Sequence, residues 1–311
     1  ACIRELLEDA AEGPARRARL RDLAAPADDP AQSAARRAEL LAALAERTPG
    51  ALTSIETVGR PDPGWLAKGA GDHKYGHGHL LALSGGVGRG GAARMAARAA
   101  LRVGAGLVTL GCPPAALIEN AARLDAVMLR AVKDVGALGA MLEDLRLNAL
   151  LLGPGLGAPE RVRPLVEAAL AAERATVLDA DALTAFAGDP AALFARLHPG
   201  CVLTPHGGEF ARLFPDLAAR LSAPAERGPA VSRLDVAREA AARAGAVVLL
   251  KGADTVIAAP DGRVRIHAAA YGRAAPWLAT AGAGDVLAGL IAGLMARDLA
   301  PFDAASTAAW L

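Results

Sequence analysis

Short apolar segments that end in glycine or polar residues alternate with helical patterns along most of this chain. A strand that is apolar along its whole length has to be buried on both faces of a sheet. The clearest segments of this kind are residues 79–84, 107–110, 149–152, 176–178, 201–203 and 246–250. Because helical patterns lie between them, the sequence predicts an α/β fold with a largely parallel central sheet covered by helices on both faces.

Helical patterns are clearest at residues 92–103 and 159–173, and shorter helices are expected after residues 181 and 208. Residues 256–258 and 264–266 differ from the other strand segments, because only a Pro-Asp-Gly turn at 260–262 connects them. A connection this short joins antiparallel strands, so these two segments predict a β-hairpin.

The chain divides into two parts by composition. Residues 1–60 are rich in Ala, Arg, Glu and Asp and are interrupted by prolines, with one helical pattern at 33–46. This composition predicts a helical or loosely ordered N-terminal extension, for which the remnant of a linker is one interpretation. Residues 61–311 predict the α/β domain. The chain starts without Met or a signal-peptide pattern and stops inside an apolar helical pattern, so we expect a fragment that is C-terminally truncated.

Charge and cysteine content narrow the partners and the compartment. The 311 residues carry a net charge of +1 and only 3% are aromatic, which argues against nucleic acid and acidic membrane surfaces. Neither is there an apolar run of about 18 residues that could span a bilayer. Cys2, Cys112 and Cys201 are odd in number and far apart, so we expect a reducing, cytoplasmic location, with Cys112 and Cys201 as buried filler.

Glycines and polar residues follow the predicted strands at the point where each strand ends. They are Gly85 and Gly86, the Gly-Pro-Gly-Leu-Gly segment 153–157, Asp179 and Asp181, the Thr-Pro-His-Gly-Gly segment 204–208, and Lys251 with Gly252. Ligands of open parallel sheets bind at the carboxyl ends of the strands. The sequence therefore predicts one shared site at this edge.

The segment Gly282-Ala-Gly-Asp285 opens an apolar helical pattern. Backbone this bare brings N–H groups close to an anion, at the positive end of the following helix. A carboxylate at this position would repel a bound phosphate. Its presence is explained if it accepts the proton of a hydroxyl beside that phosphate. The alternative is that Asp285 only caps the helix.

Other strand-end residues leave alternatives open. Asp179 and Asp181 are candidate ligands of a metal such as magnesium, but Asp181 could instead cap the next helix. His206 is expected at an open rim and favours ligand contact over a structural role. A buried Lys251 needs an anionic partner, either a nucleotide phosphate or the carboxylate of Asp254.

A further cluster lies before the first strand of the domain. His73, Lys74, His77 and His79 match no zinc spacing and predict a solvated loop, with Lys74 as a candidate phosphate contact.

Eight segments occur in an order that resembles the ADP/ATP-dependent NAD(P)H-hydrate dehydratase family. They are His73-Lys-Tyr-Gly-His-Gly78, Gly85-Gly86 with Gly91-Ala-Ala-Arg-Met95, Gly104-Ala-Gly-Leu-Val108, Gly153-Pro-Gly-Leu-Gly157, Asp179-Ala-Asp-Ala-Leu183, Thr204-Pro-His206 with Gly208-Glu209, Lys251-Gly-Ala-Asp-Thr255 and Thr280-Ala-Gly-Ala-Gly-Asp285. The resemblance covers about residues 60–311. It implies a ribokinase-like fold and the repair of hydrated NADH and NADPH, acting on the S epimer.

The resemblance also implies a cofactor set, ADP or ATP with Mg²⁺, and the residues of the site. Hydrated NADH or NADPH is implied as the small-molecule substrate, and a homo-oligomer as the assembly. The residues implied to bind the substrate are Ala92, Gly155 or Gly157, His206 and Asp285. Those implied to bind the adenine nucleotide are Lys251, Gly252, Ala253, Asp254, Thr255, Gly282 and Gly284.

The chemistry expected from this resemblance places Asp285 as the catalytic residue. Hydroxide is a poor leaving group, so phosphorylation of the ring hydroxyl makes elimination easier. Asp285 would accept the hydroxyl proton, while residues 282–284, Lys251 and the metal stabilise the spreading negative charge. Phosphate then leaves and the dihydropyridine is restored.

Three rival functions fit the sequence less well. A kinase of the same fold, acting on a sugar or on hydroxymethylpyrimidine, would share the phosphoryl chemistry, but Asn120 and Asn148 lack the glutamate of the Asn-x-x-Glu magnesium motif. An inactive nucleotide-binding fragment is the second rival, and intact Lys251, His206 and Asp285 argue against it. A Rossmann dehydrogenase lacks its glycine fingerprint here. Residues 1–60 are too short for the epimerase domain fused to some family members, so no epimerase activity is assigned.

Overall fold

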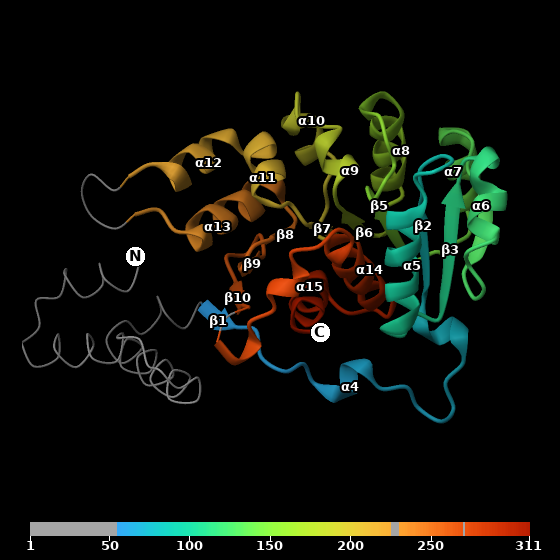
Figure 1. The fold of residues 1–311 in the computed structure, drawn as a ribbon, viewed down its shortest axis with the longest axis horizontal. Helices are drawn as coiled ribbons and strands as arrows, with labels where there is room; N and C mark the ends of the chain where they lie inside the picture. Colours follow the sequence, from blue (N-terminus) through green and yellow to red (C-terminus); the bar gives the residue numbers. More distant parts are fainter. Residues whose placement is uncertain (1–54, 225–229, 270) are drawn as a thin grey trace, which may run out of the picture.

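The computed structural model describes residues 55–224, 230–269 and 271–311, which form a central sheet with helices on both faces (Figure 1). The strands are β1 (Ile55–Thr57), β2 (His79–Leu83), β3 (Leu107–Cys112), β4 (Met128–Ala131), β5 (Ala149–Leu152), β6 (Ala175–Leu178), β7 (Cys201–Leu203), β8 (Val247–Leu250), β9 (Asp254–Ala258) and β10 (Val264–Ala268). The α-helices are α4 (Pro63–Leu66), α5 (Gly91–Arg102), α6 (Leu117–Ala121), α7 (Val135–Leu142), α8 (Pro159–Ala171), α9 (Asp181–Thr184), α10 (Pro190–Phe194), α11 (Gly207–Leu213), α12 (Pro215–Ser222), α13 (Arg233–Ala244), α14 (Ala283–Ala296) and α15 (Pro301–Trp310).

The described strands form one sheet in the order β1-β10-β9-β8-β7-β6-β5-β2-β3-β4. Every pair from β8 through β4 is parallel, which confirms the predicted α/β fold. β9 is antiparallel to both β8 and β10, so the predicted hairpin is also confirmed. The parallel strands bring their carboxyl ends to one edge, which is where the candidate site lies.

Alternation along each strand divides the core into two layers. Leu81 and Leu83 of β2 point into the layer formed with helices α7 to α13, whereas Leu80 and Ala82 point into the layer formed with α5, α14 and α15. A strand whose residues are all apolar packs into both layers, because neighbouring side chains of a strand point to opposite faces. This explains why the strands read as continuous apolar runs.

Two elements differ from the expectations. β1 lies within residues 1–60, where an extension was predicted, and pairs in parallel with β10 as an edge strand of the sheet. β4 was not predicted, because its sequence Met-Leu-Arg-Ala is mostly exposed and carries no continuous apolar pattern. Residues 33–46, which were predicted to be helical, lie outside the described residues. In the part of the chain that is described, no helix combines the length and the apolarity that a bilayer crossing requires.

Helix α14 packs closely on α5, and glycine makes this approach possible. A Cβ atom on Gly289 would overlap the carbonyl oxygen of Ala96, and one on Gly293 would lie 2.7 Å from Cγ1 of Val103. Both glycines therefore let the helix backbones meet without side chains between them. The contact matters for the site, since α14 begins with the segment that carries Asp285.

We predict that Gly289→Ala lowers the free energy of unfolding by about 1–3 kcal/mol, because the added methyl group forces α5 and α14 apart. The matched control is Gly139→Ala, at an exposed position of α7 where a Cβ would meet nothing within 4 Å. Alanine favours helix more than glycine does, so the control should gain about 0.5–1 kcal/mol. Urea denaturation measures both, and an unchanged Gly289→Ala midpoint would contradict the packing account.

Candidate active site

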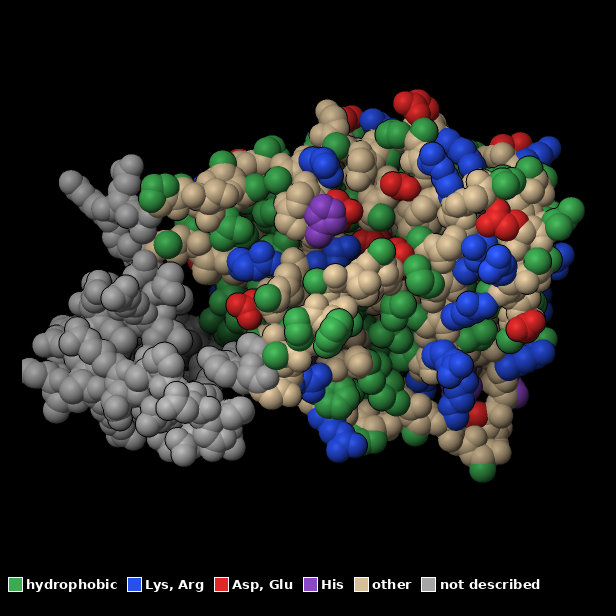
Figure 2. Space-filling view, in the orientation of Figure 1, with side chains coloured by type: hydrophobic (Ala, Val, Ile, Leu, Met, Phe, Trp, Pro, Cys, Tyr) green, Lys and Arg blue, Asp and Glu red, His purple; other side chains and the backbone are tan. Residues whose placement is uncertain are grey.

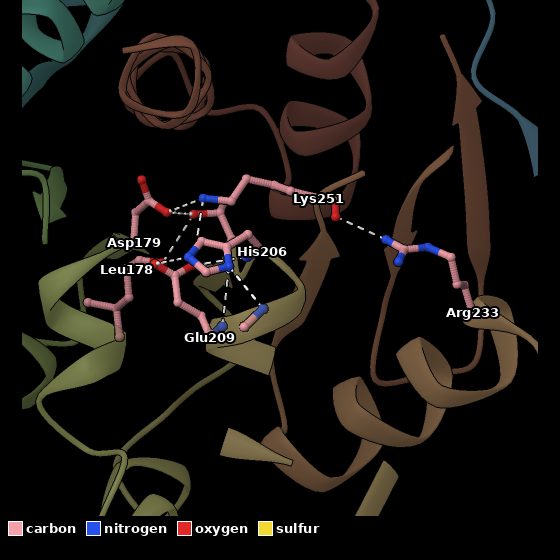
Figure 3. A network of polar contacts seen from close by, with 8 residues as sticks. Leu178, Asp179, His206, Glu209, Arg233 and Lys251 are labelled. Carbon is pink, nitrogen blue, oxygen red and sulfur yellow. Dashed lines mark hydrogen bonds and ion pairs between the residues drawn. The ribbon is translucent and has the colours of Figure 1, made fainter. Parts of the chain in front are cut away.

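Three adjacent strands deliver the polar core of the site. Asp179 directly follows β6, the segment of Thr204 and His206 follows β7, and Lys251 follows β8. These strands are parallel neighbours in the sheet. Figure 3 shows the side chain of Lys251 reaching across to Asp179, with His206 and Glu209 beside them. The prediction that the strand-end residues meet is therefore confirmed for this group.

Asp179 and Lys251 form the central ion pair. Nζ of Lys251 lies 2.7 Å from Oδ1 of Asp179, and the hydroxyl of Thr204 donates to the same oxygen at 2.8 Å. The Asp179 side chain is only 2% exposed, so the ammonium group and the hydroxyl replace the water that this carboxylate loses. The alternative pairing of Lys251 with Asp254 is wrong, since the carboxylate partner is Asp179.

The end of β8 is held from a second side by Arg233, at the start of α13. Its guanidinium donates to the carbonyl oxygen of Leu250 at 3.2 Å and to that of Lys251 at 3.0 Å, and Figure 3 shows the contact with Lys251. Burial lowers the pKa of Arg233, the expected effect of taking a cation out of water. Arg233 was missed from the sequence, because its position in a helix far from the motifs gives no signal of this contact.

His206 begins α11 as its N-cap. Nδ1 of the ring accepts hydrogen bonds from the N–H groups of Gly208 and Glu209, while the Glu209 carboxylate accepts from the N–H of His206 at 2.9 Å. This capping box fixes the ring at the rim, where the side chain is 55% exposed. His206 therefore has a structural role as the N-cap of α11, and its ring is also exposed at the rim. Glu209, buried and 3.8 Å from Nζ of Lys251, was not a predicted site residue.

Asp285 is the third residue of α14, and it does not cap that helix. The N-cap is Gly282, whose φ of 95° lies in the left-handed region, and no side chain caps this end. The interpretation of Asp285 as a helix cap is therefore wrong. Its carboxyl is half-buried, and that burial together with the nearby charge of Asp179 raises its pKa, while Lys251 opposes the rise.

The start of α14 lies close to the ion pair. A Cβ on Gly284 would come 3.6 Å from Nζ of Lys251, so the bare backbone of this turn meets the ammonium group. Gly282 lies against the side chain of Met95 of α5, because a Cβ added to Gly282 would lie 2.8 Å from Cε of Met95. Gly282, Gly284 and Asp285 are thereby brought to the same corner as Asp179 and Lys251.

Two glycine-rich loops, one after β2 and one after β5, contact each other beside the start of α5. A Cβ on Gly85 would overlap the carbonyl oxygen of Gly155, and a Cβ on Gly155 would lie 2.6 Å from the carbonyl oxygen of Arg89 and 3.6 Å from Cβ of Ala92. Gly155 and Ala92 are therefore close neighbours. Where Gly85 meets Gly155 and Gly155 meets Arg89, the loops approach each other through backbone atoms.

Asp181 does not cap α9, as one alternative held. The N-cap position is Ala180, and the Asp181 carboxylate instead accepts the N–H of Gly157 at 2.8 Å. It thus ties the 153–157 loop to the end of β6. Ala180 has a φ of 45°, a conformation that alanine rarely adopts, and such backbone strain concentrates at functional sites.

The segment after Lys251 forms a tight turn. The Thr255 hydroxyl donates to the carbonyl oxygen of Gly252 at 2.9 Å and accepts from the N–H of the same residue. Gly252, Ala253 and Asp254 are exposed at this rim. Among the described residues, the ion pairs of Lys251 are with Asp179 and Glu209 and not with Asp254.

The histidine cluster lies at the opposite edge of the sheet. Lys74 lines a cavity of about 370 Å³ together with His79 and Leu107, the first residues of β2 and β3. The prediction of Lys74 as a phosphate contact of the site is therefore wrong, because these are the amino ends of the strands. His77 pairs with Asp72 at 3.1 Å, and His79 with the hydroxyl of Thr109 at 2.8 Å.

Cys112 and Cys201 are buried and free, as expected for filler. Burial raises the pKa of Cys201 to about 12, so its thiol stays protonated.

The described residues contain no group of three or more His, Cys, Asp and Glu side chains suited to hold a metal ion. Asp179, the candidate ligand, is already bonded to Lys251 and Thr204. Magnesium is commonly held by substrate phosphates with one or two carboxylates and water, rather than by a cage of protein ligands. The residues therefore fit a metal that arrives with a nucleotide, near Asp179 and Asp285.

Figure 2 shows how side chains of different kinds are distributed over one face of the molecule. A histidine side chain lies among Lys, Arg, Asp and Glu side chains near the middle of this face, and hydrophobic side chains gather lower on the same face. Charged groups of both signs beside an apolar surface suit a ligand that combines phosphates with flat rings.

The sequence profile of the NAD(P)H-hydrate dehydratase family matches residues 80–311. This chain belongs to that family. The bifunctional NAD(P)H-hydrate repair enzyme Nnr of Gloeobacter violaceus is 40% identical over 251 residues, covering 79% of this chain and 46% of that protein. Nnr of Moorella thermoacetica is also 40% identical, covering 78% of this chain and 45% of that protein. The chain thus spans about half the length of these curated relatives.

Solved structures agree with the family and its fold. The ADP/ATP-dependent NAD(P)H-hydrate dehydratase of Bacillus subtilis, co-crystallised with ATP/Mg²⁺, is 29% identical with a TM-score of 0.61, covering 78% of this chain and 81% of that one. A ribokinase-like superfamily protein of Enterococcus faecalis has a TM-score of 0.62 at 23% identity, covering 82% of this chain and 84% of that one. The predicted ribokinase-like fold is confirmed.

The raised pKa of Asp285 leads to a prediction about stability. Its folded pKa lies above the ordinary 3.8, so the ionised carboxylate opposes folding at neutral pH and stops doing so when it is protonated. Asp285→Asn should therefore raise the urea midpoint at pH 7, with a gain that shrinks as the pH falls towards 4.

Asp216→Asn is the matched control with the opposite sign. Hydrogen bonds from Arg243 lower the pKa of the Asp216 carboxyl to about 2, so its ionised form favours folding. This variant should lose stability at pH 7. A lower urea midpoint for Asp285→Asn at pH 7 would show that the half-buried carboxylate does not carry the expected cost.

Proposed function

We propose that this chain dehydrates the S epimer of NAD(P)H hydrate to NAD(P)H, at the expense of ADP or ATP. The observation that carries the proposal is the Asp285 carboxyl, whose pKa is raised beside the Asp179–Lys251 pair at the start of α14. Membership of the NAD(P)H-hydrate dehydratase family supports the same reaction. The ATP/Mg²⁺ present with the Bacillus subtilis dehydratase supports the choice of cofactors.

Asp285 acts as the general base in this proposal. A carboxylate works best as a base when its pKa is close to the operating pH, so burial and the charge of Asp179 favour proton transfer. Asp285 takes the proton from the ring hydroxyl as the oxygen attacks the terminal phosphorus of the nucleotide. The bond from that phosphorus to the bridging oxygen breaks, and ATP becomes ADP, or ADP becomes AMP.

Lys251 and the first turn of α14 stabilise the phosphoryl group during transfer. The ammonium group is held next to the bare backbone of Gly284, and N–H groups at a helix start favour negative charge. Asp179 keeps Lys251 in this position through their 2.7 Å ion pair. Bound Mg²⁺ would supply further neutralisation of the phosphate oxygens, held near Asp179 and Asp285.

Elimination then restores the ring. The lone pair of the ring nitrogen expels the phosphate from the neighbouring carbon, and the adjacent carbon loses a proton to form the new double bond. The products are NADH or NADPH and inorganic phosphate. Water is therefore lost overall, its oxygen leaving on the phosphate.

The remaining rim residues bind the two ligands. We assign the hydrated dinucleotide to Ala92, Gly155 and Gly157, which lie where the two glycine-rich loops meet, and to the exposed ring of His206 at the start of α11. The adenine nucleotide is assigned to the turn that starts at Lys251. Gly252, Ala253, Asp254 and Thr255 form that turn, and Gly282 and Gly284 lie across from it.

We further propose that the protein works in the cytoplasm as a homo-oligomer. The free, buried cysteines suit a reducing compartment. No epimerase activity is proposed for the 311 residues of this chain.

Asp285→Asn should lower kcat by about 10²–10⁴-fold, because the carboxamide cannot accept the hydroxyl proton. The assay incubates hydrated NADH with ATP and Mg²⁺ and follows recovery of the reduced-nicotinamide absorbance. Calorimetry of ATP binding is the control, and its Kd should stay within about threefold. Full activity in Asp285→Asn would remove the proposed base.

The same assay tests the rival functions. ATP consumption only with a sugar or a pyrimidine alcohol would favour a ribokinase-like kinase over the dehydratase. Binding of ATP without turnover of any of these substrates would favour the inactive nucleotide-binding fragment.

A further inference from the structure

Arg89 stands out among the residues near the site, because the function proposed above does not use its side chain. It lies in the loop between β2 and α5, which is fixed from outside the site. The N–H of Gly88 donates to Oε2 of Glu119 at 2.7 Å, and Oε1 of Glu119 pairs with Arg94 at 3.0 Å. Arg94 also donates to the buried Asn120 at 3.0 Å. The loop that carries Arg89 is therefore anchored to α6.

The backbone of Arg89 is part of the contact between the two glycine-rich loops. Its carbonyl oxygen would lie 2.6 Å from a Cβ on Gly155, so no side chain separates the loops at this point. Gly155 itself touches Ala92, one of the residues assigned to the dinucleotide. Arg89 is thus held at the substrate side of the site, over the end of β5.

The guanidinium of Arg89 extends along the second loop. Its Nη1 would lie 3.3 Å from a Cβ on Gly157, so the group passes close to bare backbone while the residue stays exposed. Among the described residues, no carboxylate lies within 4.0 Å of it, although Asp181 bonds the N–H of Gly157. By contrast, Arg94 and Arg163 each have a carboxylate partner. Arg89 is a positioned cation with no anion assigned to it.

We propose that Arg89 binds a phosphate group of the dinucleotide substrate that is not transferred, and so determines substrate specificity. This rests on the proposed function. A guanidinium binds phosphate oxygens in pairs, and the hydrated dinucleotide carries such oxygens on its pyrophosphate and, in the NADP form, on its 2′-phosphate. The transferred phosphoryl group is bound elsewhere, by Lys251 at the end of β8. The two cations therefore serve different phosphates.

Arg89→Gln tests this assignment, because glutamine keeps hydrogen-bonding capacity but loses the charge. The KM for the hydrate should rise about 10–100-fold, with kcat and the KM for ATP within about twofold of wild type. Raising the salt concentration should increase the wild-type KM for the hydrate and affect Arg89→Gln less, since screening acts on the ion pair. Arg89→Lys should recover part of the loss.

The control is Arg102→Gln, an exposed position at the last turn of α5, which should leave every KM unchanged. The two hydrates identify the phosphate. A KM increase for hydrated NADPH alone assigns Arg89 to the 2′-phosphate, whereas an equal increase for hydrated NADH assigns it to the pyrophosphate. Unchanged KM values for both hydrates, or an equal increase for ATP, would overturn the proposal.

Calorimetry with NADP⁺ and NAD⁺ separates this proposal from the dehydratase function, since it needs no turnover. If the wild type fails to dehydrate either hydrate, the proposed function falls. Weaker binding of either dinucleotide to Arg89→Gln than to wild type would still support the role of Arg89. Equal binding to both proteins, or no binding to wild type, would reject it.

Discussion

The ion pair of Asp179 and Lys251 is the interaction on which the site depends. A carboxylate that is 2% exposed is stable in ionised form only with a cation and a donor beside it, here Lys251 and the Thr204 hydroxyl. The pair joins the carboxyl ends of β6, β7 and β8 into one surface. It also sets the charge around Asp285, whose pKa is raised first by burial and then by Asp179, while Lys251 opposes the rise.

Backbone geometry at two glycines and at Ala180 also shapes the site. The packing of α14 on α5 requires Gly289, and it brings the left-handed turn at Gly282 to the cluster. Ala180 keeps a positive φ between Asp179 and Asp181, so strain is stored where two carboxylates leave one strand end in different directions. A half-buried carboxylate and a strained turn both oppose folding, which is the usual compromise between stability and function at such sites.

The sequence predicted the sheet well, because strands buried on both faces leave a continuous apolar signal, as in residues 149–152. It failed for β4, whose exposed side chains carry no such signal, and for β1, a short edge strand. Motif order located Lys251, His206 and Asp285, but which charges pair is decided by three-dimensional contacts. Lys251 therefore pairs with Asp179, 72 residues away, and Arg233 reaches the end of β8 from a helix without any motif.

The charge of Asp179 adds to the rise in the pKa of Asp285 that burial causes. Carbon-13 NMR titration of the Asp285 carboxyl in wild type and in Asp179→Asn measures this most directly, with the resonance assigned by its absence from Asp285→Asn. We expect the Asp285 pKa to lie above 3.8 in wild type and to fall in Asp179→Asn, where the repelling charge is gone and Lys251 remains. An Asp285 pKa that is the same in both proteins would contradict the account.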